Sequence, residues 1–186
     1  CGNALQAAGH YEEAAKSYKT AIKISPNYAL AHYNLALTLR KERLLAQAEQ
    51  HFLTAIELDR NYLYAHTGLA LTYADMGEYD QAKQSYQQAL AIDPNCAEAL
   101  RQLAKLEKQA IDSPLIKHME SSYARANAGD KILLGFGLGK AYEDNQQFEK
   151  SFDYYQQANR LKRAQYQYSK NDTERLFNAL IEIPAD

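Results

Sequence analysis

The residue types that most often carry out chemistry do not form a catalytic pattern in this sequence. His32 and His66 stand 34 residues apart with no second metal ligand near either one, so their spacing favours a packing role over coordination or base catalysis. Residues 135–140 read Gly-Phe-Gly-Leu-Gly-Lys and resemble a phosphate-binding loop. Such a loop needs a strand before it, whereas the surrounding residues indicate one helix. The glycines are therefore interpreted as points of close helix packing.

The remaining reactive residues support the same view. Cys1 and Cys96 make a poor disulfide framework, and neither has the spacing of a metal site. The sequence contains no nucleophile–base pair and no cluster of metal ligands. We therefore expect no catalytic, cofactor-binding or metal-binding residues in this region.

Charge and hydropathy exclude several classes of function. The formal net charge is −2 and the pI is about 6.2, without the basic excess of a nucleic-acid-binding protein. No apolar run is long enough to span a bilayer, and no signal peptide is found. We expect a cytoplasmic protein that binds neither membrane nor nucleic acid. Because the chain begins with Cys1 rather than Met, we also expect it to be part of a longer protein.

The elements that position these residues are expected to be helices arranged in a repeat. The chain has only 8 Gly and 4 Pro among 186 residues, and its apolar residues recur at three- and four-residue steps. Residues 29–62 and 63–96 are identical at 12 of 34 positions. A period of this length indicates stacked helical hairpins.

The residue types within the period resemble the tetratricopeptide-repeat (TPR) family. The residues of 63–96 that match its signature are Ala70, Tyr73, Gly77, Tyr79, Ala82, Tyr86, Ala89 and Pro94. The resemblance implies an all-α fold, a right-handed α-solenoid of helix-turn-helix hairpins with a C-terminal capping helix. It also implies a scaffold for protein–protein interaction that binds polypeptides on the concave surface formed by the first helix of each repeat.

The chain divides into six segments by this period. They are a first repeat truncated at its N-terminus (1–28), a second (29–62), a third (63–96), a degenerate fourth (97–131), a fifth (132–165), and a linker with a capping helix (166–186). In the fourth repeat the pattern predicts helices from Ala97 to about Ile111 and from about Pro114 to Asn127. Ser113 is expected to cap the second helix.

The concave surface is predicted from the inward positions of the first helices. The expected peptide-binding residues are Asn3, Tyr33, Asn34, Leu37, Lys41, Tyr64, Thr67, Leu71, Arg101, Gln102, Lys105 and Lys108. Arg101, Lys105 and Lys108 share one helical stripe at steps of four and three residues. This surface would suit an acidic or tyrosine-containing peptide, although a solvated face is the more common role of any single lysine.

A carboxylate clamp of the kind found in chaperone-binding TPR domains is not expected. Asn3 and Asn34 stand where the clamp asparagines would be. Tyr64 and Gly68 occupy positions that require Lys and Arg, so the charge-assisted hydrogen bonds would be missing.

The last third of the chain is similar to a second family. Residues 128–130 (Ala-Gly-Asp), 136–144 (Phe-Gly-Leu-Gly-Lys-Ala-Tyr-Glu-Asp) and 158–163 (Ala-Asn-Arg-Leu-Lys-Arg) resemble the last repeat of bacterial TPR–sulfotransferase fusion proteins. The resemblance implies an alternative function, the substrate-recruiting or regulatory arm of a protein sulfotransferase. Its catalytic domain would follow residue 186 and use 3′-phosphoadenosine 5′-phosphosulfate (PAPS). A further alternative is a homodimer that associates through the exposed first hairpin.

Overall fold

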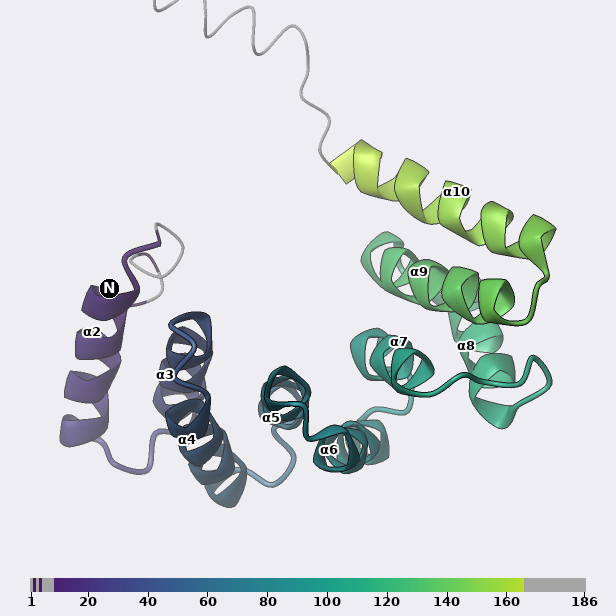
Figure 1. Cartoon of the computed structure of the whole chain (residues 1–186). Helices are drawn as coiled ribbons and strands as arrows, with labels where there is room; N and C mark the ends of the chain where they lie inside the picture. The colour runs from purple at the N-terminus through teal and green to yellow at the C-terminus, as the bar shows by residue number, and fades with distance from the viewer. Residues whose placement is uncertain (1, 3, 5–8, 166–186) are drawn as a thin grey trace, which may run out of the picture.

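The computed structural model describes residues 2, 4 and 9–165 (Figure 1). This part is all α-helical, and the helices from Tyr11 onward are α2 (Tyr11–Ile24), α3 (Ala29–Lys41), α4 (Leu45–Leu58), α5 (Leu63–Met76), α6 (Tyr79–Ile92), α7 (Ala97–Leu106), α8 (Pro114–Arg125), α9 (Ala128–Asp144) and α10 (Phe148–Gln165). The expected all-α solenoid is confirmed for these residues. The expected capping helix in 166–186 lies outside the described residues.

Successive helices form antiparallel hairpins that stack into an arc. Figure 1 shows α3, α5, α7 and α9 on the inner, concave side and α4, α6 and α8 on the outer side. α2 closes one end of the arc, and α10 covers α9 at the other. The first helix of each hairpin therefore faces the hollow, as the repeat pattern predicts.

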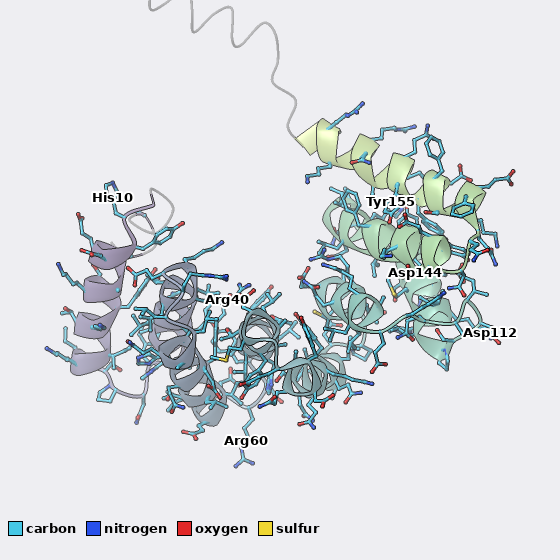
Figure 2. The ribbon with its side chains drawn as sticks, viewed as in Figure 1. His10, Arg40, Arg60, Asp112, Asp144 and Tyr155 are labelled. Atoms are coloured by element: carbon cyan, nitrogen blue, oxygen red, sulfur yellow. The ribbon has the colours of Figure 1, made fainter. Side chains whose placement is uncertain are left out.

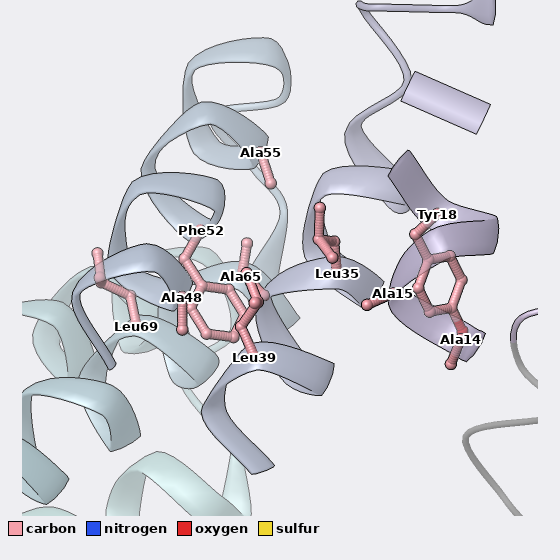
Figure 3. Close-up of a cluster of buried hydrophobic side chains, with 11 residues drawn as sticks. Ala14, Ala15, Tyr18, Leu35, Leu39, Ala48, Phe52, Ala55, Ala65 and Leu69 are labelled. Carbon is pink, nitrogen blue, oxygen red and sulfur yellow. The ribbon is translucent and has the colours of Figure 1, made fainter. Parts of the chain in front are cut away.

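The first core cluster shows why these hairpins stack. Phe52 is fully buried, with Ala48 and Ala55 one turn away on either side along the same helix (Figure 3). At Gly68 of the next hairpin, an added Cβ would lie 2.6 Å from the Phe52 Cζ atom. Small residues thus let the helices approach, and the aromatic ring fills the space between hairpins.

The turn between the two helices of a hairpin has one recurring geometry. Gly9, Arg43, Gly77 and Gln146 all have positive φ, between 61° and 83°. In the second hairpin the Leu44 N–H donates to the carbonyl oxygen five residues earlier at 2.9 Å, and the turns after Gly77 and Gln146 repeat this bond. This is the Schellman ending of a helix, in which the left-handed position favours glycine. In two of the four turns this left-handed position is occupied by a residue with a side chain, Arg43 or Gln146.

The fourth unit departs from the predicted helix lengths. α7 ends at Leu106 rather than near Ile111, and α8 ends at Arg125. The Asn145 side chain at the end of α9 donates to the Gln109 carbonyl oxygen at 2.8 Å, which holds the segment after α7 as a loop. The predicted cap is confirmed, since the Ser113 hydroxyl oxygen accepts a hydrogen bond from the Ile116 N–H.

α9 packs directly against α7. An added Cβ at Gly137 would lie 3.3 Å from the Arg101 Cα atom and 2.6 Å from the Met119 Cε atom. The glycine-rich segment 135–140 lies inside α9, so its interpretation as a helix-packing segment is confirmed. This close approach stacks the first helix of the fifth unit directly on the fourth unit.

Candidate functional site

The inner side of α3 and α5 leaves a row of side chains uncovered. Leu35, Ala36 and Leu39 are at most 2% exposed and point into the core. The expected binding residues of these helices that are exposed or half-buried are Tyr33, Asn34, Leu37, Lys41, Tyr64 and Leu71. Figure 2 shows Arg40 on the inner side of the arc and Arg60 on its outer side.

Four tyrosines gather where α3 and α5 begin. We call Tyr28, Tyr33, Tyr62 and Tyr64 the tyrosine cluster. The rings of Tyr33 and Tyr62 lie 5.1 Å apart between centroids, at an angle of 44°. Burial, with smaller effects from the other three tyrosines and Asp59, raises the pKa of Tyr62 to about 12. Burial and then Tyr64 raise the pKa of Tyr33. The hydroxyl groups of Tyr33 and Tyr62 therefore stay protonated at neutral pH.

Ion pairs lie at the C-terminal ends of α3 and α5 and in the first half of α7. The Arg40 Nε atom lies 2.8 Å from Asp75 Oδ2, which joins α3 to α5. On α7, Arg101 lies 2.9 Å from Glu98, and the Gln102 amide donates to the same carboxylate at 2.8 Å. Because these groups are paired and 21 to 29% exposed, they form a polar floor with little net charge.

The hydroxyl of Tyr86 lies beneath this polar floor. Tyr86 is 1% exposed, and its hydroxyl has no hydrogen-bond partner among the described residues. Burial and the nearby Glu98 raise its pKa, with smaller opposing effects of Arg40 and Arg101. A buried hydroxyl without a hydrogen-bond partner is energetically costly. The core beneath this part of the inner face therefore contains a polar group whose hydrogen-bonding capacity is not used.

Several expected binding residues are placed differently from the prediction. Thr67 is 8% exposed, and its hydroxyl donates to the Tyr64 carbonyl oxygen at 3.1 Å. This expected binding residue is therefore largely buried, and only a small part of its side chain is available on the inner face. Lys108 follows the end of α7, so the predicted stripe of three cations is not formed. Lys105 is exposed on α7, and Asn3 lies outside the described residues.

The sequence interpretation missed the contribution of the residues that precede the inner helices. Tyr28 and Tyr62 are the N-cap residues of α3 and α5, and neither was among the expected binding residues. The sequence did contain a signal for these two tyrosines, because Asn27-Tyr28 and Asn61-Tyr62 align when the sequence is shifted by 34 residues. Only the structure shows that the Tyr62 ring packs beside Tyr33, with Tyr28 and Tyr64 close enough to affect the pKa of Tyr62, which is raised mainly by burial.

Comparisons with known proteins identify the family. Models of the tetratricopeptide repeat match residues 29–62, 63–96 and 136–165, and a further TPR model matches residues 2–41. These matches together span well over half of the chain, which belongs to the tetratricopeptide-repeat proteins. TPR proteins are a family of non-catalytic scaffolds that mediate protein–protein interactions and bind peptides.

Solved structures agree with this assignment. A crystal structure of MamA is 21% identical, with a TM-score of 0.66, and the alignment covers 90% of this chain and 98% of MamA. The first TPR domain of Spaghetti (RPAP3), bound to the HSP90 peptide SRMEEVD, is 27% identical over 56% of this chain and 83% of its own, with a TM-score of 0.55. The Arabidopsis OM64 TPR domain is 24% identical over 56% of this chain and 87% of its own, with a TM-score of 0.56. A search of curated proteins found no match.

Three other expectations from the sequence concern a fused sulfotransferase, membrane binding and self-association. The comparisons give no support to the resemblance to sulfotransferase fusions. Within the part of the chain that the structure describes, no helix is long and apolar enough to cross a membrane. The expected self-association involves the first hairpin, of which residues 1, 3 and 5–8 lie outside the described residues.

Proposed function

We propose that this chain is an interaction scaffold that binds an extended polypeptide across the inner faces of α3, α5 and α7. The observation that carries the proposal is the row of uncovered inner side chains, above all Tyr64, which is 63% exposed on a helix whose other face is buried. Large exposed aromatic side chains are enriched at binding surfaces because they bury much area at little entropic cost.

The charges of the inner face favour a ligand with acidic groups. Lys41 and Lys105 are exposed on the inner helices α3 and α7, whereas Arg40 and Arg101 already have carboxylate partners. An acidic ligand would therefore meet the two lysines first, and tyrosine hydroxyls of the inner face could donate to it. The peptide bound by the Spaghetti TPR domain, SRMEEVD, also carries acidic residues.

Recognition of that ligand would differ from a carboxylate clamp. The position of Gly68 is filled from the other side by Phe52, 2.6 Å from where a Cβ would stand, so a long basic side chain has no room there. The exposed Tyr64 occupies the other position that would require a cation. We therefore propose binding along the length of an extended segment rather than capture of a chain terminus.

Site-specific crosslinking tests the location of the binding surface. A photoreactive residue at Tyr64 is compared with one at Tyr79, which is 61% exposed but lies on the outer helix α6. We expect saturable crosslinking of a polypeptide from source-cell extract at position 64 and none at position 79. Equal crosslinking from the two positions, or none from either, would refute binding on the inner face.

Charge reversal tests the acidic preference on the captured polypeptide. Lys41→Glu and Lys105→Glu are expected to weaken its binding severalfold each, since a rim charge contributes about 0.5–1 kcal/mol. Lys117→Glu on the outer helix α8 is the matched control, also exposed. Unchanged affinity in the two inner variants would exclude an acidic ligand at these lysines.

A further inference from the structure

We infer that the tyrosine cluster docks an uncharged, proline-containing stretch of the bound polypeptide. This inference rests on the proposed function and specifies the chemistry of the segment that lies over the beginnings of α3 and α5. It is carried by the packing, exposure and charge of Tyr28, Tyr33, Tyr62 and Tyr64.

The floor of the cluster is held firmly by the protein core. The Tyr33 ring lies 6.0 Å from the fully buried Phe52 ring and 5.1 Å from that of Tyr62. Tyr33 and Tyr62 are half-buried, so part of each side chain is ordered before any ligand arrives. A rigid aromatic floor lowers the entropic cost of binding.

The upper part of the cluster is open to solvent. Tyr64 is 63% exposed, Tyr28 is 47% exposed, and Leu30 in the first turn of α3 is 41% exposed. No other pair of described tyrosines with this exposure is placed at the start of neighbouring inner helices. Exposed rings beside an ordered floor form a surface onto which flat apolar groups can stack.

The polar groups of the cluster suit a ligand backbone. Tyrosine hydroxyls are protonated at neutral pH, at the ordinary pKa of about 10 as well as at the raised pKa of Tyr33 and Tyr62, so they can donate hydrogen bonds. A polyproline II segment has no internal hydrogen bonds, so its carbonyl oxygens are free to accept. It also presents flat rings, and aromatic-lined surfaces commonly recognise it for these reasons.

Charge complementarity favours an uncharged occupant. Asp59, the carboxylate nearest Tyr62, already accepts the Asn61 N–H at 3.0 Å. Arg60 points to the outer side of the arc (Figure 2). The inner charges Arg40 and Lys41 lie at the far end of α3, about 10–20 Å from Tyr33 and Tyr28 at the helical rise per residue. A neutral stretch would therefore lie on the cluster, with any acidic residue of the ligand further along, near Lys41.

Direct binding of defined peptides tests this inference on the intact chain. The probe is a fluorescein-labelled polyproline peptide of about ten residues, compared by anisotropy with a Gly-Ser peptide and an arginine-containing Gly-Ser peptide of equal length. We expect the polyproline peptide to bind about tenfold more tightly than the Gly-Ser peptide. Equal affinity for these two would overturn the inference, and so would preference for the arginine-containing peptide, which would indicate a cation site.

Matched tyrosine variants locate the bound probe. Tyr64→Ala and Tyr28→Ala are each expected to weaken polyproline binding about 3- to 10-fold, in line with the loss of one aromatic contact. Tyr79→Ala, with similar exposure on α6, should leave binding unchanged, and circular dichroism checks that all three variants fold. An equal loss in Tyr79→Ala, or none in the cluster variants, would overturn the assignment.

The two proposals fail separately. Crosslinking from position 64 without polyproline binding would keep the inner binding face and reject the proline-containing segment. Polyproline binding that depends on Tyr64, without any polypeptide crosslinked from extract, would support the chemistry of the cluster and reject the proposed scaffold function.

Discussion

The ring nitrogen Nε2 of His118 lies 2.8 Å from the carbonyl oxygen of Pro94, across the junction between the third and fourth units. Because a carbonyl oxygen only accepts, this nitrogen must carry the proton. Leu100 stands 34 residues after His66, where the repeat would have supplied a histidine. In the degenerate fourth unit, the histidine that donates to this carbonyl oxygen therefore comes from the second helix, α8.

The two preceding junctions have the same bond from a different helix. His32 Nε2 lies 3.0 Å from the Pro26 carbonyl oxygen, and His66 Nε2 lies 3.0 Å from that of Arg60. All three acceptors occupy equivalent positions before the first helix of a unit. The recurring histidines are therefore structural, and the packing role predicted for His32 and His66 includes a specific hydrogen bond.

Removal of the third of these bonds should weaken the stack. We expect His118→Ala to lower the free energy of unfolding by about 1 kcal/mol, the usual contribution of one hydrogen bond, as measured by urea denaturation. His10→Ala is the control, since His10 is exposed and makes no side-chain capping bond. Equal stability of the two variants would show that the bond to Pro94 contributes nothing.

The left-handed turns predict two stabilising substitutions. Arg43 and Gln146 have φ of 64° and 61°, which strains a residue with a Cβ atom by about 1 kcal/mol. Arg43→Gly and Gln146→Gly should therefore each raise the thermal midpoint, and Gly77→Ala should lower it. Gln147→Gly tests the position directly after the strained one and should not stabilise. A lower midpoint in both glycine variants would contradict this account.

The contact between Gly68 and Phe52 predicts intolerance of a single methyl group. Gly68→Ala should destabilise the chain by about 1–3 kcal/mol through overpacking, because the new Cβ would lie 2.6 Å from the Phe52 Cζ atom. The smaller side chain of Phe52→Leu in the same chain should recover part of this loss in a double-mutant cycle. Strictly additive effects would mean that the two positions are not coupled. Gly129→Ala is the control, because its new Cβ would meet only the Asn127 Oδ1 atom, at 3.2 Å.

The paired tyrosine Tyr73 predicts a loss of stability at alkaline pH. Burial, and next its hydrogen bond of 3.0 Å to Glu49, raise the pKa of Tyr73 from 10.0 to about 12. The unfolded chain loses this proton first as the pH rises, so the stabilisation is complete below pH 10 and is lost between pH 10 and about 12. Tyr73→Phe should flatten this part of the stability–pH curve, measured by urea denaturation. Exposed Tyr79→Phe should not, and an identical slope in all three proteins would reject the assignment.

Much of the fold could be predicted because the repeat carries local signals. The spacing of Ala36 and Ala70, 34 residues apart and both fully buried, places the close helix contacts correctly. The Ser113-Pro114 pair marks the start of α8. The turn at Arg43 follows the geometry of Gly77 despite its side chain, because the surrounding hairpin contacts are the same.

The candidate site was less predictable for physical reasons that concern particular residues. Thr67 shares its periodic position with the half-buried Tyr33, but it is itself 8% exposed, and that burial depends on how the helices around α5 pack. Lys108 lies outside α7 because the loop is held by Asn145, 36 residues after Gln109. Neither relation can be read from spacing within one helix.

The sequence by itself determined the helical hairpins, their 34-residue stacking and the general inner face, since these follow from local periodicity and residue size. Only the tertiary structure decided which inner side chains remain available. It paired Arg40 with Asp75 across two helices, left the Tyr86 hydroxyl without a partner among the described residues, and brought Tyr62 beside Tyr33. Such contacts join residues of separate hairpins, and their distances depend on the packing angle between helices rather than on any local pattern.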